Sequence, residues 1–413
     1  MRRFIFLLLT FFLIGIYASA QIKMGVITDT HYLSEKLMDD GYALHDYIYT
    51  SGKNIKYTPA VLDKVIADYL QSDIEVLLVC GDMTKDGERQ SHIDFVNKLK
   101  PLQDKGVKVF AIPGNHDINM PNAVEYKGNK TFPVDSISPQ DFEKIYAGCG
   151  YHDALKRDTA SLSYVARLDH KTWLLAIDAA KYKEYTTRSI TSGRILPQTE
   201  EWIVNVLDEA NAKGIQVVGM MHWGLTEHIM YQSTFFAEYL VDDWQRLAAL
   251  FADKGMKAIF TGHFHSNDIS LFTSPEGNKI YDIETGTLAA YPFAYRFVNL
   301  YSDKMDVKTK NITSVPDNAN LAEEDRLRMK ALSETLAMQK LKKMGLDIPE
   351  KTMTQFSNVL SQIFLLHAYG DEEADDKLIY SMKKLSETMD TSFEMEEVEL
   401  DFPPADNNVE IIF

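Results

Sequence analysis

Five short clusters along this chain contain residues that bind hard metal ions. They are Asp29-Thr30-His31, Gly81-Asp82, Gly114-Asn115-His116-Asp117, Met221-His222 and Thr261-Gly262-His263-Phe264-His265. One Asp-x-His or His-x-His cluster would carry little weight, because such pairs are common. The full set offers carboxylate, amide and imidazole groups in about the number that two adjacent divalent metals need. It therefore indicates a binuclear metal site, and with it the hydrolysis of a phosphate ester.

The two metals of such a site need a shared ligand, because they lie about 3.5–4 Å apart. A carboxylate can bridge them with its two oxygens. Asp82 is the natural candidate, since other ligands come before and after it in the sequence. His263 and His265 would point to the same side if Phe264 faced the opposite way, as in an extended strand. Two imidazoles placed in this way can each serve a different metal.

Six short apolar runs, rich in β-branched residues, precede most of these clusters. They span residues 23–28, 75–79, 107–112, 172–177, 216–220 and 257–260. Runs of this kind are typical of strands buried on both faces. Helical spacing of apolar residues predicts three helices between them, over residues 58–69, 197–214 and 240–255. The alternation predicts an α/β protein whose strands carry the ligands to one sheet edge, where such sheets bind their ligands.

The ordered clusters resemble the calcineurin-like metallophosphoesterases, whose pattern runs D-x-H, G-D, G-N-H-[DE], H and G-H-x-H. Every part of that pattern is present here in the same order. The resemblance implies a four-layer α-β-β-α sandwich of two mixed sheets, in place of a single open sheet. It also implies that a phosphate ester is hydrolysed by a metal-bridging hydroxide.

The resemblance assigns seven ligands to two metal ions that share one of them. The ligands are Asp29, His31, Asp82 and His265 for one ion, and Asp82, Asn115, His222 and His263 for the other. His116 is not a ligand in this scheme, and it stabilises the transition state or protonates the leaving oxygen. Asp117 is expected to orient His116, as carboxylates beside active-site histidines often do. Manganese, iron and zinc all suit these ligands.

The residues that follow Asp82 argue against two branches of this superfamily. Purple acid phosphatases have a tyrosine three residues after the shared aspartate, where this chain has Lys85. Protein serine/threonine phosphatases continue with Gly-Asp-x-x-Asp-Arg-Gly, and the stretch from Gly81 to Glu88 lacks that arginine. The stretch is more similar to bacterial exported phosphohydrolases and class III cyclic nucleotide phosphodiesterases. We therefore expect a phosphodiesterase that acts on a nucleotide or another small phosphodiester.

Two other functions stay open at this point. One is a phosphomonoesterase of broad range. The other is a non-catalytic binding module on the same fold, which the loss of ligands would favour, although none is missing here. Six further histidines have no partner pattern and are interpreted as ordinary. They are His45, His92, His152, His170, His228 and His367.

The N-terminus has the features of a signal peptide over residues 1–20. Arg2 and Arg3 precede an apolar run, and Ala18-Ser19-Ala20 offers the small residues that a signal peptidase reads. We expect cleavage before Gln21, export to the periplasm or the extracellular space, and no stable membrane span afterwards. An uncleaved anchor is the alternative, although the run is short for a span, which needs about 20 apolar residues.

Charge and cysteine content limit the partners further. The formal net charge of −17 argues against a general affinity for DNA, RNA or anionic lipid, which need a basic surface. The expected partner is therefore a small phosphate ester and not a nucleic-acid polymer. Export permits a disulfide between Cys80 and Cys149, but Cys80 ends an apolar run, and two unpaired cysteines are the favoured interpretation.

Residues 21–312 are assigned to the catalytic domain and residues 313–413 to a helical C-terminal domain with an acidic tail. Apolar positions at helical spacing over residues 327–341 and 356–364 support this. The acidic tail is interpreted as a solvated face in preference to a binding arm. Residues 33–57 form an insertion that either shapes a substrate pocket or packs as a surface loop. Its tyrosines are Tyr42, Tyr47, Tyr49 and Tyr57.

Overall fold

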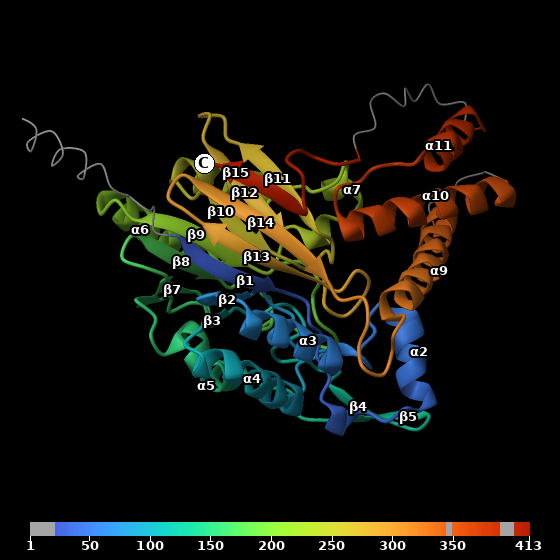
Figure 1. The fold of residues 1–413 in the computed structure, drawn as a ribbon, viewed down its shortest axis with the longest axis horizontal. Helices are drawn as coiled ribbons and strands as arrows, with labels where there is room; N and C mark the ends of the chain where they lie inside the picture. Colours follow the sequence, from blue (N-terminus) through green and yellow to red (C-terminus); the bar gives the residue numbers. More distant parts are fainter. Residues whose placement is uncertain (1–20, 344–348, 389–399) are drawn as a thin grey trace, which may run out of the picture.

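Two large β-sheets form the centre of the fold (Figure 1). The computed structural model describes residues 21–343, 349–388 and 400–413, so the predicted signal peptide and most of the acidic tail lie outside the described residues. One hydrophobic core runs through both sheets, from Val26 and Leu78 in the first sheet to Leu174 and Phe260 in the second. Burial of this continuous apolar surface is the main source of stability in such a fold.

The first sheet has the strand order β15-β14-β13-β1-β2-β3. Its strands β1, β2 and β3 are parallel, and the others pair in antiparallel fashion. The strand bounds are β1 Ile22–Ile27, β2 Val76–Val79, β3 Lys108–Ala111, β13 Ala294–Leu300, β14 Lys304–Asn311 and β15 Asn408–Ile412.

The second sheet has the order β11-β12-β10-β9-β8-β7-β6. Its central strands β8, β9, β10 and β12 are parallel, and its outer strands are antiparallel. The bounds are β6 Lys156–Arg157, β7 Tyr164–Arg167, β8 Thr172–Ile177, β9 Gln216–Met221, β10 Ala258–Thr261, β11 Asp268–Thr273 and β12 Lys279–Glu284. A separate hairpin joins β4 Val124–Lys127 to β5 Lys130–Pro133.

Helices cover the outer faces of both sheets. Apolar residues of α3 and α4 belong to the core of the first sheet, and those of α6 and α8 pack on the second. The result is the predicted four-layer sandwich of two mixed sheets. The helical bounds are η2 Glu35–Leu37, α2 Tyr42–Ser51, α3 Thr58–Gln71, α4 Arg89–Asp104, α5 Pro139–Ile145, η3 Ala147–Tyr151, α6 Pro197–Ala212, α7 Gln232–Phe235, η4 Ala237–Tyr239, α8 Trp244–Asp253, α9 Leu321–Lys343, α10 Glu350–Tyr369 and α11 Asp376–Thr388.

All six predicted strands are present, as β1, β2, β3, β8, β9 and β10. The three predicted helices are α3, α6 and α8. Helix α8 begins at Trp244 and not at Leu240, because Leu240 pairs with Gly224 in an isolated β-bridge. Cys80 and Cys149 are buried and unpaired, as predicted.

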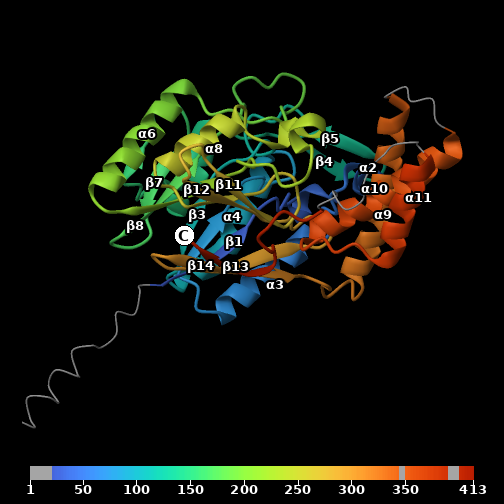
Figure 2. The same ribbon diagram turned by 90° about the horizontal axis from the view of Figure 1, so that it is seen from above.

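The C-terminal part of the chain is helical, but it does not end as a separate unit. Helices α9, α10 and α11 lie together at one end of the sandwich, beside α2 (Figure 2). The chain then returns as β15, which pairs with β14 at the edge of the first sheet. The last described strand of the chain therefore belongs to the first sheet. Among the described helices, none has the length and apolar character to cross a membrane.

Residues 33–57 are not a loop. They form η2 and α2, and a short segment follows α2. Tyr42 and Tyr49 are exposed, whereas the ring of Tyr47 lies 4.6 Å from the ammonium group of Lys85. Tyr47 therefore contacts a residue outside the insertion.

Candidate metal centre

The predicted ligands lie just beyond the C-terminal ends of strands in both sheets. Asp29 and His31 follow β1, Asp82 follows β2 and Asn115 follows β3. His222 follows β9 directly, and the loop after β10 carries the last two histidines. Because the ends of these parallel strands meet, residues far apart in sequence come into contact.

The carboxylates and imidazoles form two adjacent groups. One contains Asp29, His31 and His265, and the other contains Asp82, His222 and His263, each with its ligand atoms within 4.8 Å of one another. The Asp82 Oδ2 atom lies 3.7 Å from His31 Nε2 and 3.4 Å from His222 Nε2. It therefore reaches both groups, as a shared ligand must.

Several buried ligand atoms have no hydrogen-bond partner among the described residues. They include Asn115 Oδ1 and His222 Nε2. The other ring nitrogen of His222, Nδ1, donates to the Cys80 carbonyl over 2.9 Å, which leaves Nε2 as a ligand atom. Unpartnered buried polar atoms are costly, so a cation in this position fits the residues present.

Electrostatics of the two groups also favour a bound cation. Burial lowers the pKa of His31 far below its usual value and lowers the pKa of His263 to about 3, so both rings are neutral, as metal ligation requires. Burial opposes a charge on His222 as well, but Asp82 and Asp29 outweigh it and raise its pKa to about 9. In the absence of a metal ion, Asp82 and Asp29 therefore favour the protonated form of His222. A bound metal ion would supply that positive charge instead.

The backbone is left-handed at five of the seven predicted ligands. The φ angles are 47° at Asp29, 41° at His31, 48° at Asp82, 77° at His263 and 71° at His265. The expectation that strand alternation places the last two side chains is therefore wrong, since β10 ends at Thr261. Such residues cost about 1–3 kcal/mol each and persist only where the surrounding structure holds them.

Close approach explains the glycines of the clusters. A Cβ on Gly114 would lie 2.6 Å from the backbone nitrogen of Asp82 and 2.8 Å from its Cγ. A Cβ on Gly262 would lie 2.5 Å from Asp29 Oδ2. A larger residue would occupy the space that these two carboxylates need.

His116 lies beside the two groups and takes no part in either. Its backbone nitrogen donates to Asp82 Oδ1 over 2.7 Å, and its ring lies perpendicular to that of His31 at 5.1 Å. The Nδ1 atom is 2.7 Å from Asp86 Oδ1, and Nε2 is 3.1 Å from Lys53 Nζ. The ring is partly exposed.

Asp117 does not orient His116, contrary to the prediction. Its carboxylate accepts hydrogen bonds from the backbone nitrogens of Gly114 (2.9 Å) and Thr84 (3.0 Å). It therefore fixes the loops that carry the ligands, and burial raises its pKa to about 6. Asp86 takes the orienting position instead.

Asp86 remains ionised because of its neighbours. Burial would raise the pKa of its carboxyl, but the charge of Lys85 and the hydrogen bond to His116 lower it to about 2. Asp86 lies four residues after Asp82, and that proximity was the one sequence signal that could have drawn attention to it.

Sequence reasoning also missed Lys53, which belongs to no motif. Helix α9 holds the chain on both sides of it. Arg328 donates to the Gly52 carbonyl over 3.2 Å, and the Asn54 side chain donates to Asp325 over 2.9 Å. Asp325 and Arg328 form an ion pair of 2.7 Å. The C-terminal helices therefore position Lys53 against His116.

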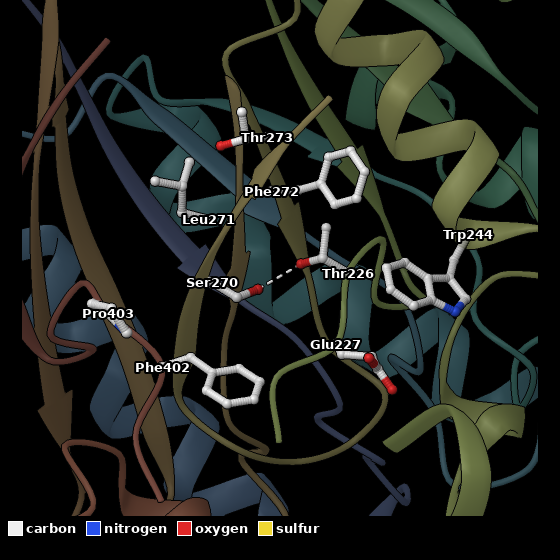
Figure 3. Close-up of a pocket in the computed structure, with 9 residues that line it drawn as sticks. All are labelled: Thr226, Glu227, Trp244, Ser270, Leu271, Phe272, Thr273, Phe402 and Pro403. Atoms are coloured by element: carbon white, nitrogen blue, oxygen red, sulfur yellow. Dashed lines mark hydrogen bonds between the residues drawn. The ribbon is translucent and has the colours of Figure 1, made fainter. Parts of the chain in front are cut away.

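A pocket of about 380 Å³ lies elsewhere, between β11, Trp244 and Phe402 (Figure 3). None of its lining residues is a predicted ligand. At its inner wall the hydroxyl groups of Thr226 and Ser270 share a hydrogen bond of 2.5 Å. The pocket is therefore separate from the candidate centre.

Comparison with known proteins agrees with the geometry. A family model described as calcineurin-like phosphoesterase matches residues 22–267, which is more than half of the chain. No curated protein matches significantly.

Solved structures resemble this one at low identity. A dimetal phosphatase from Danio rerio is 14% identical, with 70% of this chain and 96% of that chain covered and a TM-score of 0.49. A putative 5'-nucleotidase from Staphylococcus aureus is 14% identical, with 77% and 59% covered and a TM-score of 0.42. A purple acid phosphatase from yellow lupin (Lupinus luteus) is 10% identical, with 71% and 52% covered and a TM-score of 0.40.

Proposed function

Because the chain belongs to the calcineurin-like phosphoesterase family, and is therefore a hydrolase of phosphoric esters, we propose that it cleaves small phosphodiesters, nucleotides among them. The observation that carries the proposal is the position of His116. It lies between Asp86 and Lys53, at the edge of two ligand groups that Asp82 joins.

The proposed metal ligands are Asp29, His31, Asp82, Asn115, His222, His263 and His265. Two metal ions held by these residues would act as Lewis acids on the phosphoryl oxygens and supply an activated water. Manganese, iron or zinc is proposed, because the donors are oxygen and imidazole nitrogen without a thiolate.

The chain's own residues provide the leaving-group chemistry. The Asp86 carboxylate accepts from His116 Nδ1 and so fixes the orientation of the ring. The Lys53 ammonium donates to Nε2, so a proton can pass from Lys53 through Nε2 to the oxygen of the departing alcohol, a contribution of about 10²–10⁴-fold. Lys53 beside Nε2 stabilises negative charge on a phosphoryl oxygen.

Charge around His116 supports a diester in preference to a monoester. Lys53 is the one cationic side chain in hydrogen-bond contact with His116 among the described residues. Lys85 is committed to its ion pair with Asp86 and to the ring of Tyr47. A phosphodiester carries one negative charge and a monoester carries up to two, so one lysine in addition to the two proposed metal ions suits the diester.

Hydrolysis by purified, manganese-loaded protein tests the proposal. We expect a higher kcat/KM for bis-p-nitrophenyl phosphate than for p-nitrophenyl phosphate, and loss of both activities in His222→Ala. His152→Ala, a change at an exposed histidine, is the matched control. Preference for the monoester would refute the diester proposal. No turnover with metals confirmed bound would indicate a binding module.

We also propose that the protein functions outside the cytoplasm, after removal of residues 1–20. The basic, apolar and small-residue segments of this stretch support the proposal. N-terminal sequencing of the exported protein should give Gln21 as its first residue. A first residue of Met1 would contradict cleavage.

A further inference from the structure

A second cluster of metal-ligand residues lies beside the centre and shares no residue with it. It consists of Asp268 at the start of β11, His367 in the last turn of α10, and Glu372 in the segment after α10. All three are buried, and their ligand atoms lie within 4.8 Å of one another. We refer to these three residues as the extension cluster.

The internal contacts of the extension cluster leave it incomplete. His367 Nδ1 lies 2.6 Å from Glu372 Oε1 and 3.5 Å from Asp268 Oδ2. The second oxygens, Asp268 Oδ2 and Glu372 Oε2, have no hydrogen-bond partner among the described residues, and neither has His367 Nε2. A plain ion pair between His367 and Glu372 would leave buried carboxylate oxygens unsatisfied, at a cost of about 1–3 kcal/mol or more each.

The surroundings of the extension cluster are strongly acidic. Three more buried carboxylates lie close by, those of Asp282, Glu284 and Asp406, whereas the basic groups around them are His228, His367 and Arg296. Burial raises the pKa of Glu284 to about 7 and the pKa of Asp406 to about 9. The unpartnered atoms of Asp268, His367 and Glu372 therefore lie in a buried, acidic environment where a bound cation would be favourable.

We propose that the extension cluster is a third metal site, which binds a divalent transition metal such as Zn²⁺ through Asp268, His367 and Glu372. An imidazole with two carboxylates is a donor set that suits zinc. Calcium is disfavoured because it prefers oxygen ligands throughout. The proposal does not depend on the nature of the phosphate ester.

The position of this site gives it a structural role. A metal there joins α10 and the segment after it to the second sheet, because Asp268 begins β11. The ring of His367 also packs at 5.3 Å against Phe264, the residue between His263 and His265. The third metal would therefore link the C-terminal helices to the sandwich. It would also stabilise the loop that carries His263 and His265, two proposed ligands of the candidate centre.

Metal stoichiometry tests the proposal. Full-length protein is loaded with Zn²⁺, dialysed and measured by mass spectrometry for zinc per chain. We expect three zinc ions in wild-type protein, two in Glu372→Gln and three in Glu373→Gln, the matched control at the adjacent exposed residue. The combined variant His222→Ala/His263→Ala should keep zinc at the extension cluster while it loses zinc from the catalytic centre.

Two further measurements address folding and position. Zinc should raise the thermal melting temperature of His222→Ala/His263→Ala, and Glu372→Gln in that background should abolish the increase. Crystals soaked in Zn²⁺ should show an anomalous peak among Asp268, His367 and Glu372. Equal zinc content in wild-type and Glu372→Gln, or no anomalous peak at the cluster, would show a buried ion pair only and overturn the proposal.

Discussion

Gly114→Ala should disable the centre although Gly114 itself binds nothing. An added Cβ would lie 2.6 Å from the backbone nitrogen of Asp82, whereas ordinary contacts begin at 3.4 Å. The two atoms must therefore separate by 0.8 Å, the difference between these distances. Asp82 is the proposed shared ligand, and a displacement of about 1 Å at a catalytic group can cost about 10²-fold in rate. We expect kcat/KM to fall by on the order of 10²-fold or more.

The assay is hydrolysis of bis-p-nitrophenyl phosphate with saturating manganese, together with metal content and thermal melting. Gly148→Ala is the matched control, because the nearest heavy atom to its added Cβ lies 3.5 Å away, within ordinary contact. This control should keep both metals of the candidate centre and wild-type activity. The comparison separates the position of Asp82 from the general effect of replacing a glycine.

Wild-type kcat/KM in Gly114→Ala, with both metals of the candidate centre bound, would refute the reasoning. It would mean that the loop after β3 can shift to accommodate the added Cβ without displacing Asp82. A loss of activity with metal content unchanged would place the effect in ligand geometry, and a loss of one metal would place it in ligand binding. Both of these outcomes agree with the prediction.

Four other changes test the remaining parts of the site. His116→Ala should keep metal content unchanged and lower kcat by about 10²–10⁴-fold, least for substrates with good leaving groups; metal loss would show that it is a ligand. Asp86→Asn should lower kcat by about 10–100-fold, because the ring of His116 loses its charged partner, and an unchanged kcat would contradict that role. Asp325→Asn removes the carboxylate that pairs with Arg328 and accepts from Asn54, next to Lys53. It should lower both the melting temperature and kcat. Full activity in a folded variant would show that α9 does not position Lys53. Burial lowers the pKa of His92 to about 3 in the folded state, whereas the unfolded value is about 6.5. The stabilising effect of neutral His92 is therefore present above about pH 6.5 and is lost as the pH falls toward 3. The free energy of unfolding should fall by up to about 1.4 kcal/mol per pH unit over that range. Metal-free His92→Gln should show a shallower loss of unfolding free energy over that range than the metal-free wild type, and equal slopes would assign the acid sensitivity to other groups.

The strands and ligand clusters could be predicted because both depend on local sequence. A parallel strand buried on both faces needs a continuous apolar run, and β2 and β8 are such runs. The polar residues that follow each run then lie at one sheet edge. Four layers could not be derived from these runs, since a single sheet satisfies the same pattern, and the family resemblance was needed to expect a sandwich.

The contacts around His116 could not be predicted from sequence spacing. Asp117 was expected to orient His116 because it is adjacent, but adjacent side chains in this loop point to different partners. Lys53 reaches the site through an insertion that α9 holds in place, and no local pattern encodes that contact. The left-handed backbone at His263 and His265 could not be predicted either, because a Gly-His-x-His sequence is compatible with both a strand and a strained loop.

The return of the chain to β14 as β15 has a mechanical consequence. The C-terminal helices follow β14 in the sequence, and the strand after them, β15, pairs with β14 at the edge of the first sheet. Any rigid displacement of α9 would pull on Gly52 and Asn54 and so draw Lys53 away from His116. A molecule that pushed these helices outward would thus separate Lys53 from His116, the two residues proposed to act on the leaving group, without contacting either of them.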